Sequence, residues 1–484
     1  MKVLCLNPPS KYSTNVARDL FYGCWCKGKR IAGQLFPPLN LLYVATVLKS
    51  EGHNVFVWDA QAERKDFTAV AKDIEKEKPE VLFIPTSTMN IKEDSALLHA
   101  YKKVNPGMIT VAFGSHINFD PKQSLDFGGV DYGIAREPEA VIKNLINALG
   151  RNDPVDDIPG ISYVKNEKLR INPPAPFIAN LDDLPIPDRS YIEDFVYFSP
   201  LVKKIPWTNA LTSRGCPGKC NFCTSPYFYG QSLRFRSAEN VVAEMEYLLS
   251  LGYKEVFYRD ETFTAHQPRL KKICELIIEK GIEISWLCNA RIDTLNRNKE
   301  TLALMKKAGC HLVKIGVESG SQTILDNIRK GIKVEDTIKV FRWMNEVGME
   351  SHAHMMLGCP GETKETVNQT IEFIKMIKPT TVTFNAFTLF PGTPMYEEIK
   401  AKVPTLDGAE HDTVREHSIG DHSEVYSELL EGEVGHAVRR AYKEFYLRPA
   451  YVWQTLKKMR SLDEFRRTVS AGLDVFSYAT GEEE

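Results

Sequence analysis

The 484-residue sequence lacks the defining features of several large protein classes. It contains no run of about eighteen uninterrupted apolar residues, so no membrane-spanning helix is expected. Lys and Arg together number 61 and Asp and Glu number 63, which leaves no global field to recruit nucleic acid. Residues 1–6 lead into structure rather than into a cleavable signal. We therefore expect a cytoplasmic protein that is soluble or at most peripheral to the membrane.

Cysteine is scarce, with ten residues in the whole chain, and most of those outside one close triplet are scattered through apolar segments. This distribution is typical of a reducing compartment and not of a secreted disulfide framework. Two further cysteines, Cys24 and Cys26, lie one residue apart in a Gly- and Lys-rich segment. They either belong to an ordered loop that closes over a site or bind metal, and their role stays open.

The close triplet consists of Cys216, Cys220 and Cys223. Three thiolates at this spacing can hold three irons of a cubane cluster and leave the fourth iron open to another ligand. Zinc is the alternative metal, but a structural zinc site requires a fourth Cys or His, and the nearest downstream candidate is the isolated His266. The triplet therefore favours a [4Fe–4S] cluster with an exchangeable ligand.

With Phe222 directly before the third cysteine, the motif Cys-x3-Cys-x-aromatic-Cys resembles that of the radical S-adenosylmethionine (SAM) superfamily. The resemblance implies that SAM binds the open iron and that Phe222 lies against its adenine. It further implies that one-electron reduction of the sulfonium yields a 5′-deoxyadenosyl radical. An electron donor such as ferredoxin or flavodoxin and a low-oxygen habitat belong to the same expectation.

Residues 1–150 alternate short apolar or β-branched runs with amphipathic segments, which predicts an α/β fold with a doubly wound, Rossmann-like parallel sheet. Ligands of such folds bind at the carboxyl ends of the strands. The fingerprint Gly-x-Gly-x-x-Gly is absent after the first strand, which argues against a nicotinamide or flavin cofactor. The candidate ligand-binding residues at the predicted strand ends are Asn7, Thr86, Ser87, Gly114, His116 and Glu137.

The same region resembles the flavodoxin-like cobalamin-binding domain that precedes many radical SAM proteins. The residues that carry the resemblance are Asn7-Pro-Pro9, residues 36–42, Gly52-His53 with Asp59, and Gly114-Ser-His116 with Pro121. It implies that the strand-end residues contact cobalamin. Because the motif Asp-x-His-x-x-Gly is missing, it also implies cobalt without a protein histidine below it. His53 and His116 are then structural or phosphate-side contacts.

Residues 151–206 are proline-rich and aperiodic and are predicted to be a linker. Between residues 207 and 400, six strand–helix repeats predict a partial (β/α)6 barrel with its active groups at the strand ends. The expected SAM contacts stand at or near these strand ends, in segments that resemble those of the family. They are Phe222, Asp260, Glu261, Asn289, Arg291, Glu318, Ser319, Gly358 and Pro391. Asp260 and Glu261 stand where the superfamily often has a Gly-Gly-Glu contact, and which carboxylate makes that contact stays open.

Residues 401–484 are predicted to form a helical C-terminal domain that caps the substrate cavity. Between residues 437 and 467, nine Arg and Lys residues face three acidic residues and are interleaved with aromatic side chains. We expect this stretch to be a basic aromatic helix and favour a packed lid with a solvated face. The alternative is a surface that rests on anionic lipid.

Together these patterns predict a cobalamin-dependent radical SAM enzyme. In the commonest form of the family, the radical abstracts hydrogen from an unactivated carbon, which then takes a methyl group from methylcobalamin. Hopanoid and tetraether lipid modification proteins and the anaerobic magnesium-protoporphyrin ester cyclase have similar patterns, so a lipid or tetrapyrrole substrate is one option. Radical oxidation, cyclisation or carbon–carbon coupling without methyl transfer is the alternative enzymatic hypothesis. A cobalamin-binding sensor would not need the cysteine triplet.

Overall fold

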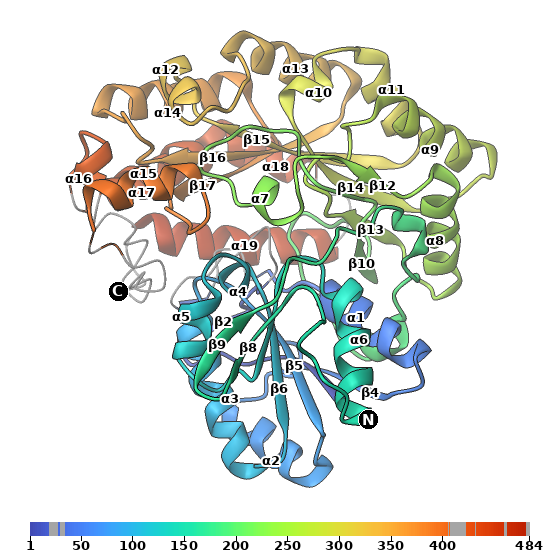
Figure 1. Cartoon of the computed structure of the whole chain (residues 1–484). Helices are drawn as coiled ribbons and strands as arrows, with labels where there is room; N and C mark the ends of the chain where they lie inside the picture. The colour runs from blue at the N-terminus through green and yellow to red at the C-terminus, as the bar shows by residue number, and fades with distance from the viewer. Residues whose placement is uncertain are drawn as a thin grey trace.

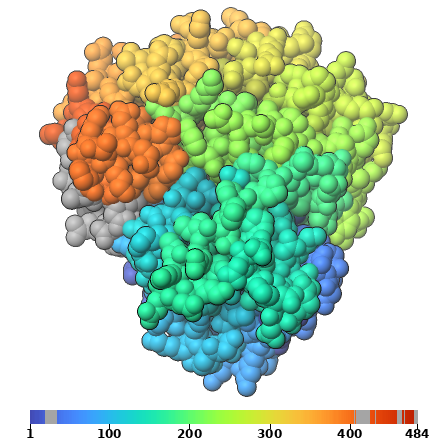
Figure 2. Space-filling view, viewed as in Figure 1, coloured from blue at the N-terminus to red at the C-terminus, as the bar shows by residue number. Residues whose placement is uncertain are grey.

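The computed structural model describes residues 1–18, 28–29, 34–404, 406, 423–430, 432–458 and 462–480. Two largely parallel β-sheets, each flanked by helices, form the two halves of the molecule (Figure 1). The N-terminal segments, blue to teal, pack directly beneath the green and orange segments that follow (Figure 2). Cys24 and Cys26 lie outside the described residues.

The first sheet has seven strands in the order β4-β1-β5-β6-β7-β8-β9. Its parallel strands are β1 (Lys2–Asn7), β4 (Asn54–Asp59), β5 (Val81–Thr86), β6 (Ile109–Gly114) and β7 (Tyr132–Ile134). Strand β1 shows why the sheet is covered on both faces: Val3 and Cys5 join one apolar cluster, while Leu4 and Leu6 join another. A strand whose alternate side chains are all apolar must be buried on both sides.

Helices cover both faces of the first sheet (Figure 1). Helices α1 (Leu39–Ser50) and α6 (Pro138–Arg151) contribute to the apolar cluster that contains Val3. Helices α2 (Phe67–Glu77), α3 (Ile91–Val104) and α5 (Pro121–Asp126) contribute to the cluster on the opposite face, and the short α4 (Ser115–Phe119) follows β6 directly. The expected alternation of strands and helices over residues 1–150 is therefore present.

The predicted linker contains regular structure that the sequence pattern did not reveal. Strands β8 (Ile161–Lys165) and β9 (Lys168–Ile171) form a hairpin that extends the first sheet in antiparallel orientation. Its turn residues, Asn166 and Glu167, both have positive φ, as tight hairpin turns require. Residues 161–171 thus belong to the first sheet, and only the 3₁₀ turns Leu181–Asp183 and Arg189–Ile192 follow before the next strand.

The second sheet contains six parallel strands in sequence order. They are β10 (Trp207–Ala210), β13 (Glu255–Tyr258), β14 (Ser285–Ala290), β15 (Cys310–Glu318), β16 (Glu350–Leu357) and β17 (Thr381–Ala386). The connecting helices are α7 (Ser225–Phe228), α8 (Ala238–Ser250), α9 (Gln267–Glu279), α10 (Ile292–Leu295), α11 (Lys299–Lys307), α12 (Gln322–Asn327), α13 (Val334–Val347) and α14 (Lys364–Ile377), and α15 (Pro394–Lys402) follows β17. Two two-stranded pairs, β2 (Ser13–Thr14) with β3 (Gly28–Lys29) and β11 (Ser213–Arg214) with β12 (Arg234–Phe235), complete the strands.

The C-terminal part is helical, as predicted, but its basic stretch is not one helix. It is divided among α17 (Glu433–Tyr446), α18 (Pro449–Lys458) and α19 (Leu462–Thr480), with the short α16 (Ser423–Tyr426) before them. Proline favours the first turn of a helix, which explains why α18 begins at Pro449. Helix α17 packs on α14 and β17, where the Tyr446 hydroxyl donates to the carbonyl of Val382 (2.6 Å). Within the described residues, no helix is long and apolar enough to cross a membrane.

A buried ion cluster joins the two halves of the molecule at Arg214, in the short strand β11. Its guanidinium nitrogens lie 2.7 Å from Glu139 and 3.2 Å from Glu137, at the start of α6. The rings of Tyr43 and Tyr229 lie 5.8 and 5.4 Å from the guanidinium carbon. All three charged side chains are at most 1% exposed; Glu137 also pairs with Arg234 at 2.8 Å, whereas Glu139 depends on Arg214 for compensation of its charge.

Glu139→Gln should therefore lower the free energy of unfolding by about 2 kcal/mol, because it leaves the Arg214 guanidinium without one of its carboxylates. Glu246→Gln is the matched control, since Glu246 pairs with Lys280 at the surface and both side chains are nearly half exposed. That control should cost less than about 1 kcal/mol. Urea unfolding followed by circular dichroism checks both, and equal effects of the two substitutions would contradict the account.

Candidate functional site

A cavity of about 1110 Å³ opens at the second sheet and reaches the first. Cys216, Cys220 and Cys223 line it together with the ends of β13 to β17. Gln34, Phe36 and Met89 enter it from the N-terminal half, and α17, α18 and α19 close another side. The volume is at the upper limit for a single small ligand, so it has room for a cofactor and a substrate together.

The loop that carries the cysteines is held by hydrogen bonds to its neighbours. The backbone N–H of Cys216 donates to the carbonyl of Gly230 (3.2 Å). Gly215 has φ +94°, and a Cβ there would lie 2.3 Å from the carbonyl oxygen of Ser232, so only glycine fits. Among the described residues no three His, Cys, Asp or Glu are grouped as ligands of a single metal ion. A cubane does not require that grouping, because each cysteine binds a different iron.

Two cations lie beside the cysteines. The Nη1 of Arg291 lies 3.6 Å from Sγ of Cys220, and Lys330 pairs with Glu318 at 2.6 Å. Burial raises the pKa of the Cys216 thiol, while the backbone N–H of Gly218 and the charge of Arg291 act in the opposite direction. Cations near the thiols favour thiolates, which are the form that binds iron. The chemistry of this set of donors fits a cluster.

Glu261 lines the cavity beside the cysteine loop. Its Oε1 accepts from the hydroxyl of Ser225 (3.1 Å), while its buried Oε2 has no hydrogen-bond partner among the described residues. Burial raises the pKa of Glu261 to about 8, because no cation compensates the carboxylate fully. A positively charged ligand group would supply that compensation. The Oδ1 of Asn289, likewise buried and unpartnered in the described part, faces the same cavity.

Asp260 occupies a different environment from its neighbour. It accepts from the backbone N–H of Thr212 (2.7 Å) and from the hydroxyls of Thr212 and Ser213 (both 2.5 Å). The described cavity lining does not include it. Its oxygens are thus engaged in fixing the start of the cysteine loop, which leaves Glu261 as the carboxylate that faces a ligand.

The other expected SAM contacts divide into two groups. Phe222, Arg291 and Glu318 line the cavity, and the Phe222 ring lies 6.4 Å from that of Phe387. Ser319, Gly358 and Pro391 are outside the described lining. The hydroxyl of Ser319 lies 3.0 Å from that of Thr370, and Gly358 lies against Val434 of α17.

The expected cobalamin contacts gather at the carboxyl edge of the first sheet. Several of their side chains are engaged in hydrogen bonds with nearby polar residues. Asn7 donates to Asp59 (2.8 Å), Thr86 to Asp94 (2.8 Å) and Ser87 to Asn90 (2.9 Å). Gly114 has φ +143°, and a Cβ there would lie 1.8 Å from the carbonyl oxygen of Thr86, its partner in the neighbouring parallel strand. This close approach of the two backbones requires glycine. His116 Nε2 lies 2.8 Å from Gln123 Oε1, and Glu137 belongs to the Arg214 ion cluster.

None of these six residues is among the described residues that line the cavity. The loop after β5 nevertheless continues from Thr86 and Ser87 to Met89, which does line it. The N-terminal half therefore reaches the cavity that holds the cysteines through Gln34, Phe36 and Met89, and not through the six expected residues.

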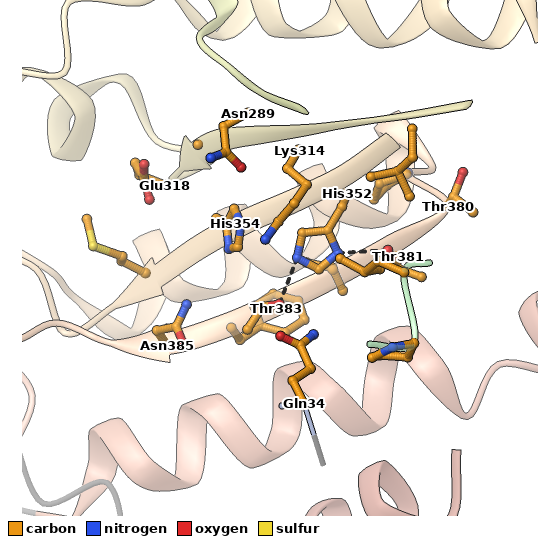
Figure 3. Close-up of a pocket in the computed structure, with 18 of the residues that line it drawn as sticks. Gln34, Asn289, Lys314, Glu318, His352, His354, Thr380, Thr381, Thr383 and Asn385 are labelled. Carbon is orange, nitrogen blue, oxygen red and sulfur yellow. Dashed lines mark hydrogen bonds between the residues drawn. The ribbon is translucent and has the colours of Figure 1, made fainter. Parts of the chain in front are cut away.

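Sequence reasoning missed three polar residues on the cavity wall: Lys314, His352 and His354 (Figure 3). Each stands in a strand that is otherwise rich in buried apolar residues. A lysine inside an apolar strand, and two histidines two residues apart in the next strand, were the available signals. Whether these residues form one group depends on how the strands pair, and the pairing cannot be derived from the sequence.

Comparison with known proteins now identifies the family. A family model described as "Radical SAM superfamily" matches residues 211–374. The uncharacterized methyltransferase PH0819 of Pyrococcus horikoshii is 31% identical over 93% of this chain and 93% of its own length. The chain belongs to the radical SAM superfamily. A second model, described as "B12 binding domain", matches residues 30–146 of this radical SAM enzyme.

More distant relatives cover most of this radical SAM enzyme as well. The anaerobic magnesium-protoporphyrin IX monomethyl ester cyclase of Rubrivivax gelatinosus is 27% identical over 88% of this chain and 76% of its own. The hopanoid C-3 methylase of Methylococcus capsulatus is 27% identical over 84% and 74%. The prediction of a cobalamin-dependent enzyme with SAM, a [4Fe–4S] cluster and cobalamin as cofactors is confirmed.

Two solved structures share the fold. The methyltransferase TsrM from Kitasatospora setae, with tryptophan substrate and a SAM analogue bound, superposes with a TM-score of 0.65 over 83% of this chain and 76% of TsrM, at 20% identity. OxsB with aqua-cobalamin bound gives a TM-score of 0.69 over 98% of this chain and 72% of OxsB, at 18% identity. At these identities the likeness establishes the arrangement of the two α/β halves.

Cys220→Ala should abolish cluster assembly and 5′-deoxyadenosine formation and leave the cobalamin content unchanged, because the first sheet does not depend on the thiol. Reconstituted wild-type protein should contain about four irons and four sulfides per chain. Cys274→Ala, on the buried face of α9, is the matched control and should keep the cluster. Iron, sulfide and corrinoid analysis checks these values. About eight irons per chain, or joint loss of cluster and cobalamin, would contradict the assignment.

Proposed function

We propose that the enzyme abstracts hydrogen from an unactivated carbon of a small molecule and replaces it by a methyl group. The supporting observation is that one cavity is lined by the cysteine loop, by Glu261 with its unpartnered carboxylate oxygen and by Gln34, Phe36 and Met89 of the N-terminal half. When bound, the cluster and SAM supply a 5′-deoxyadenosyl radical and cobalamin supplies the methyl group. The named methyltransferases among the relatives favour methyl transfer.

In the domain division that we propose, residues 1–150 form a Rossmann-like, flavodoxin-like cobalamin domain, to which the hairpin at 161–171 adds two strands. Residues 151–206 then lead to a partial (β/α)6 barrel at 207–400 and a helical cap at 401–484. The sequence order and common direction of the six strands in the second sheet support the barrel. The packing of α17 on α14 and β17 supports the cap, and a cytoplasmic location accords with this organisation.

Each side chain of the proposed SAM subsite has a defined task. Cys216, Cys220 and Cys223 hold the cluster, and Glu261 accepts from the ammonium group of the SAM methionine. Asn289 and Glu318 line the cavity and can orient the methionine or ribose, while Lys330 pairs with Glu318 at 2.6 Å. The apolar side chains of the cavity wall limit the entry of water and of other molecules that would compete with the substrate for the site. A ferredoxin or flavodoxin supplies the electron.

The cyclase of Rubrivivax gelatinosus favours a second candidate, radical oxidation or cyclisation without methyl transfer. Anaerobic incubation of the reconstituted enzyme with methyl-deuterated SAM, cobalamin and a lipid and pigment extract of the host distinguishes the two. Methyl transfer predicts a product that carries the deuterated methyl group and equal amounts of 5′-deoxyadenosine and S-adenosylhomocysteine. Deoxyadenosine with an unlabelled product would favour the second candidate, and no deoxyadenosine at all would contradict both.

Glu261→Gln should weaken SAM binding about tenfold, because the amide cannot compensate the ammonium charge of SAM. Iron content and thermal midpoint should stay near the wild-type values. Asp260→Asn is the matched comparison and should lower stability and iron content but leave the SAM affinity per assembled cluster unchanged, since it replaces the oxygen that accepts from the hydroxyls of Thr212 and Ser213 by an N–H donor. Equilibrium dialysis with radiolabelled SAM measures the affinity. Equal losses of affinity in both variants would contradict the distinction.

Peripheral membrane contact is a further part of the proposal. Helices α18 and α19 expose several large apolar side chains, among them Trp453, which is 61% exposed, and Leu473, which is 63% exposed. The stretch 437–467, which overlaps these helices in sequence, also contains nine Arg and Lys residues. Each cation near an anionic surface contributes on the order of 1 kcal/mol, so reversible binding would not require a spanning helix.

Co-sedimentation with anionic liposomes should therefore show binding at low salt that is lost at high salt. Joint replacement of Arg439, Arg440, Lys457 and Lys458 by Gln should abolish it. Lys72→Gln with Lys76→Gln, on the exposed face of α2, is the control and should bind like wild type. No binding at low salt, or binding unchanged in the fourfold variant, would leave these helices as a structural cap.

A further inference from the structure

One row of polar side chains crosses the cavity wall on four neighbouring strands. The parallel register pairs Asn289 with Lys314, Lys314 with His352, and His352 with Thr381. The next row, two residues farther along, contains His354 opposite Thr383. All six line the cavity, and Figure 3 shows Lys314, His352 and His354 grouped in its interior. This group is separate from the cysteine loop and from Glu261.

Hydrogen bonds hold the histidines in position. His352 lies 2.7 Å from the hydroxyl of Thr381 through Nδ1 and 2.8 Å from that of Thr383 through Nε2, so both ring nitrogens are used (Figure 3). The His354 ring stands nearly perpendicular to it at 4.6 Å. The Nε2 of His354 is buried and has no hydrogen-bond partner among the described residues. A buried polar atom of this kind in a cavity wall indicates a ligand partner.

The charges that act on the two histidines are positive. Burial, His354 and Lys314 lower the pKa of His352, and burial, Lys314 and Lys330 lower that of His354, so both rings stay neutral. The Lys314 ammonium lies 4.8 Å from the centre of the Phe257 ring and is 6% exposed. A buried ammonium beside a neutral imidazole that can donate through Nε2 is suited to bind an anion.

The opposite wall of the cavity is apolar. It is formed by the C-terminal helices through Tyr446, Tyr451, Val452, Leu456, Val469 and Phe476. Several of these side chains, including Val452 (45% exposed) and Phe476 (43% exposed), continue to the protein surface. A ligand in this cavity that reaches Lys314 can therefore also contact these apolar side chains. Burial of aliphatic or aromatic carbon of the ligand against them favours binding.

We propose that the substrate is an anionic amphiphile whose carboxylate or phosphate group is bound by Lys314 and His354 and whose apolar body lies against α18 and α19. The inference rests on the proposed function, since it names the substrate class of that same cavity. Anchoring an end group on the strands would hold the apolar carbons at a fixed distance from Glu261 and the cysteine loop. Lys314 and His354 are thus specificity-determining residues.

Binding of three probes to the reconstituted protein tests the inference: decanoate, decyl phosphate and decanol, measured by equilibrium dialysis. Wild-type protein should bind at least one of the two anions about tenfold more tightly than decanol, a difference of about 1.4 kcal/mol. The preferred anion distinguishes a carboxylate from a phosphate substrate. Lys314→Met should abolish the preference and leave decanol binding unchanged, and Lys314→Arg should restore part of it. Lys378→Met, at the exposed rim, is the control and should keep the preference.

Equal affinity of wild type for all three probes, or an undiminished preference in Lys314→Met, would overturn the inference. If Lys314→Met does not fold by circular dichroism, His354→Gln decides: loss of the preference supports the inference and its retention overturns it. Formation of 5′-deoxyadenosine from SAM is measured in the same preparations. Intact deoxyadenosine formation without anion preference would refute the substrate class alone, whereas its absence in wild type would refute the proposed function.

Discussion

The buried guanidinium of Arg214 fixes the position of the cysteine loop relative to the first sheet. It stands two residues before Cys216 and pairs with Glu137 and Glu139, which begin α6 on the other half of the molecule. Separating these groups would leave uncompensated charges in an apolar interior, so the arrangement resists displacement. As a result the cluster ligands and the loop that carries Met89 face one cavity. Chemistry that requires two cofactors at one substrate carbon depends on this constraint.

The strands of both sheets could be predicted because continuous apolar runs are unusual outside parallel sheets buried on both faces. The hairpin at 161–171 could not. Residues 161–163 of β8 are all buried, whereas Val164 and Ile171 are more than half exposed, so neither strand shows alternation, and pairing with β7 decides their conformation. The C-terminal basic stretch forms several helices and not the single expected one. Pro449 within it is a favourable first residue for a new helix.

Within the site, local motifs were predictable and pairing across strands was not. The cysteine triplet is contained in one loop, so its spacing alone indicated a cluster. Asp260 and Glu261 are adjacent carboxylates at one strand end, and only the contacts of Thr212 and Ser213 with Asp260 separate their roles. Lys314 and His352 are far apart in sequence and meet because β15 and β16 pair in register. The proposed anion-binding subsite therefore forms only when the strands of the second sheet pair.

The central claim is that the cluster and cobalamin face the same cavity. Electron paramagnetic resonance of the reconstituted enzyme tests it directly, through the spin relaxation of cob(II)alamin with the cluster oxidised and with it reduced by one electron. The account predicts that the reduced, paramagnetic cluster accelerates relaxation of the cobalt signal, and that Cys220→Ala, which lacks the cluster, shows no such change. Cobalt relaxation that is independent of the cluster's oxidation state in the wild-type enzyme would contradict a shared cavity.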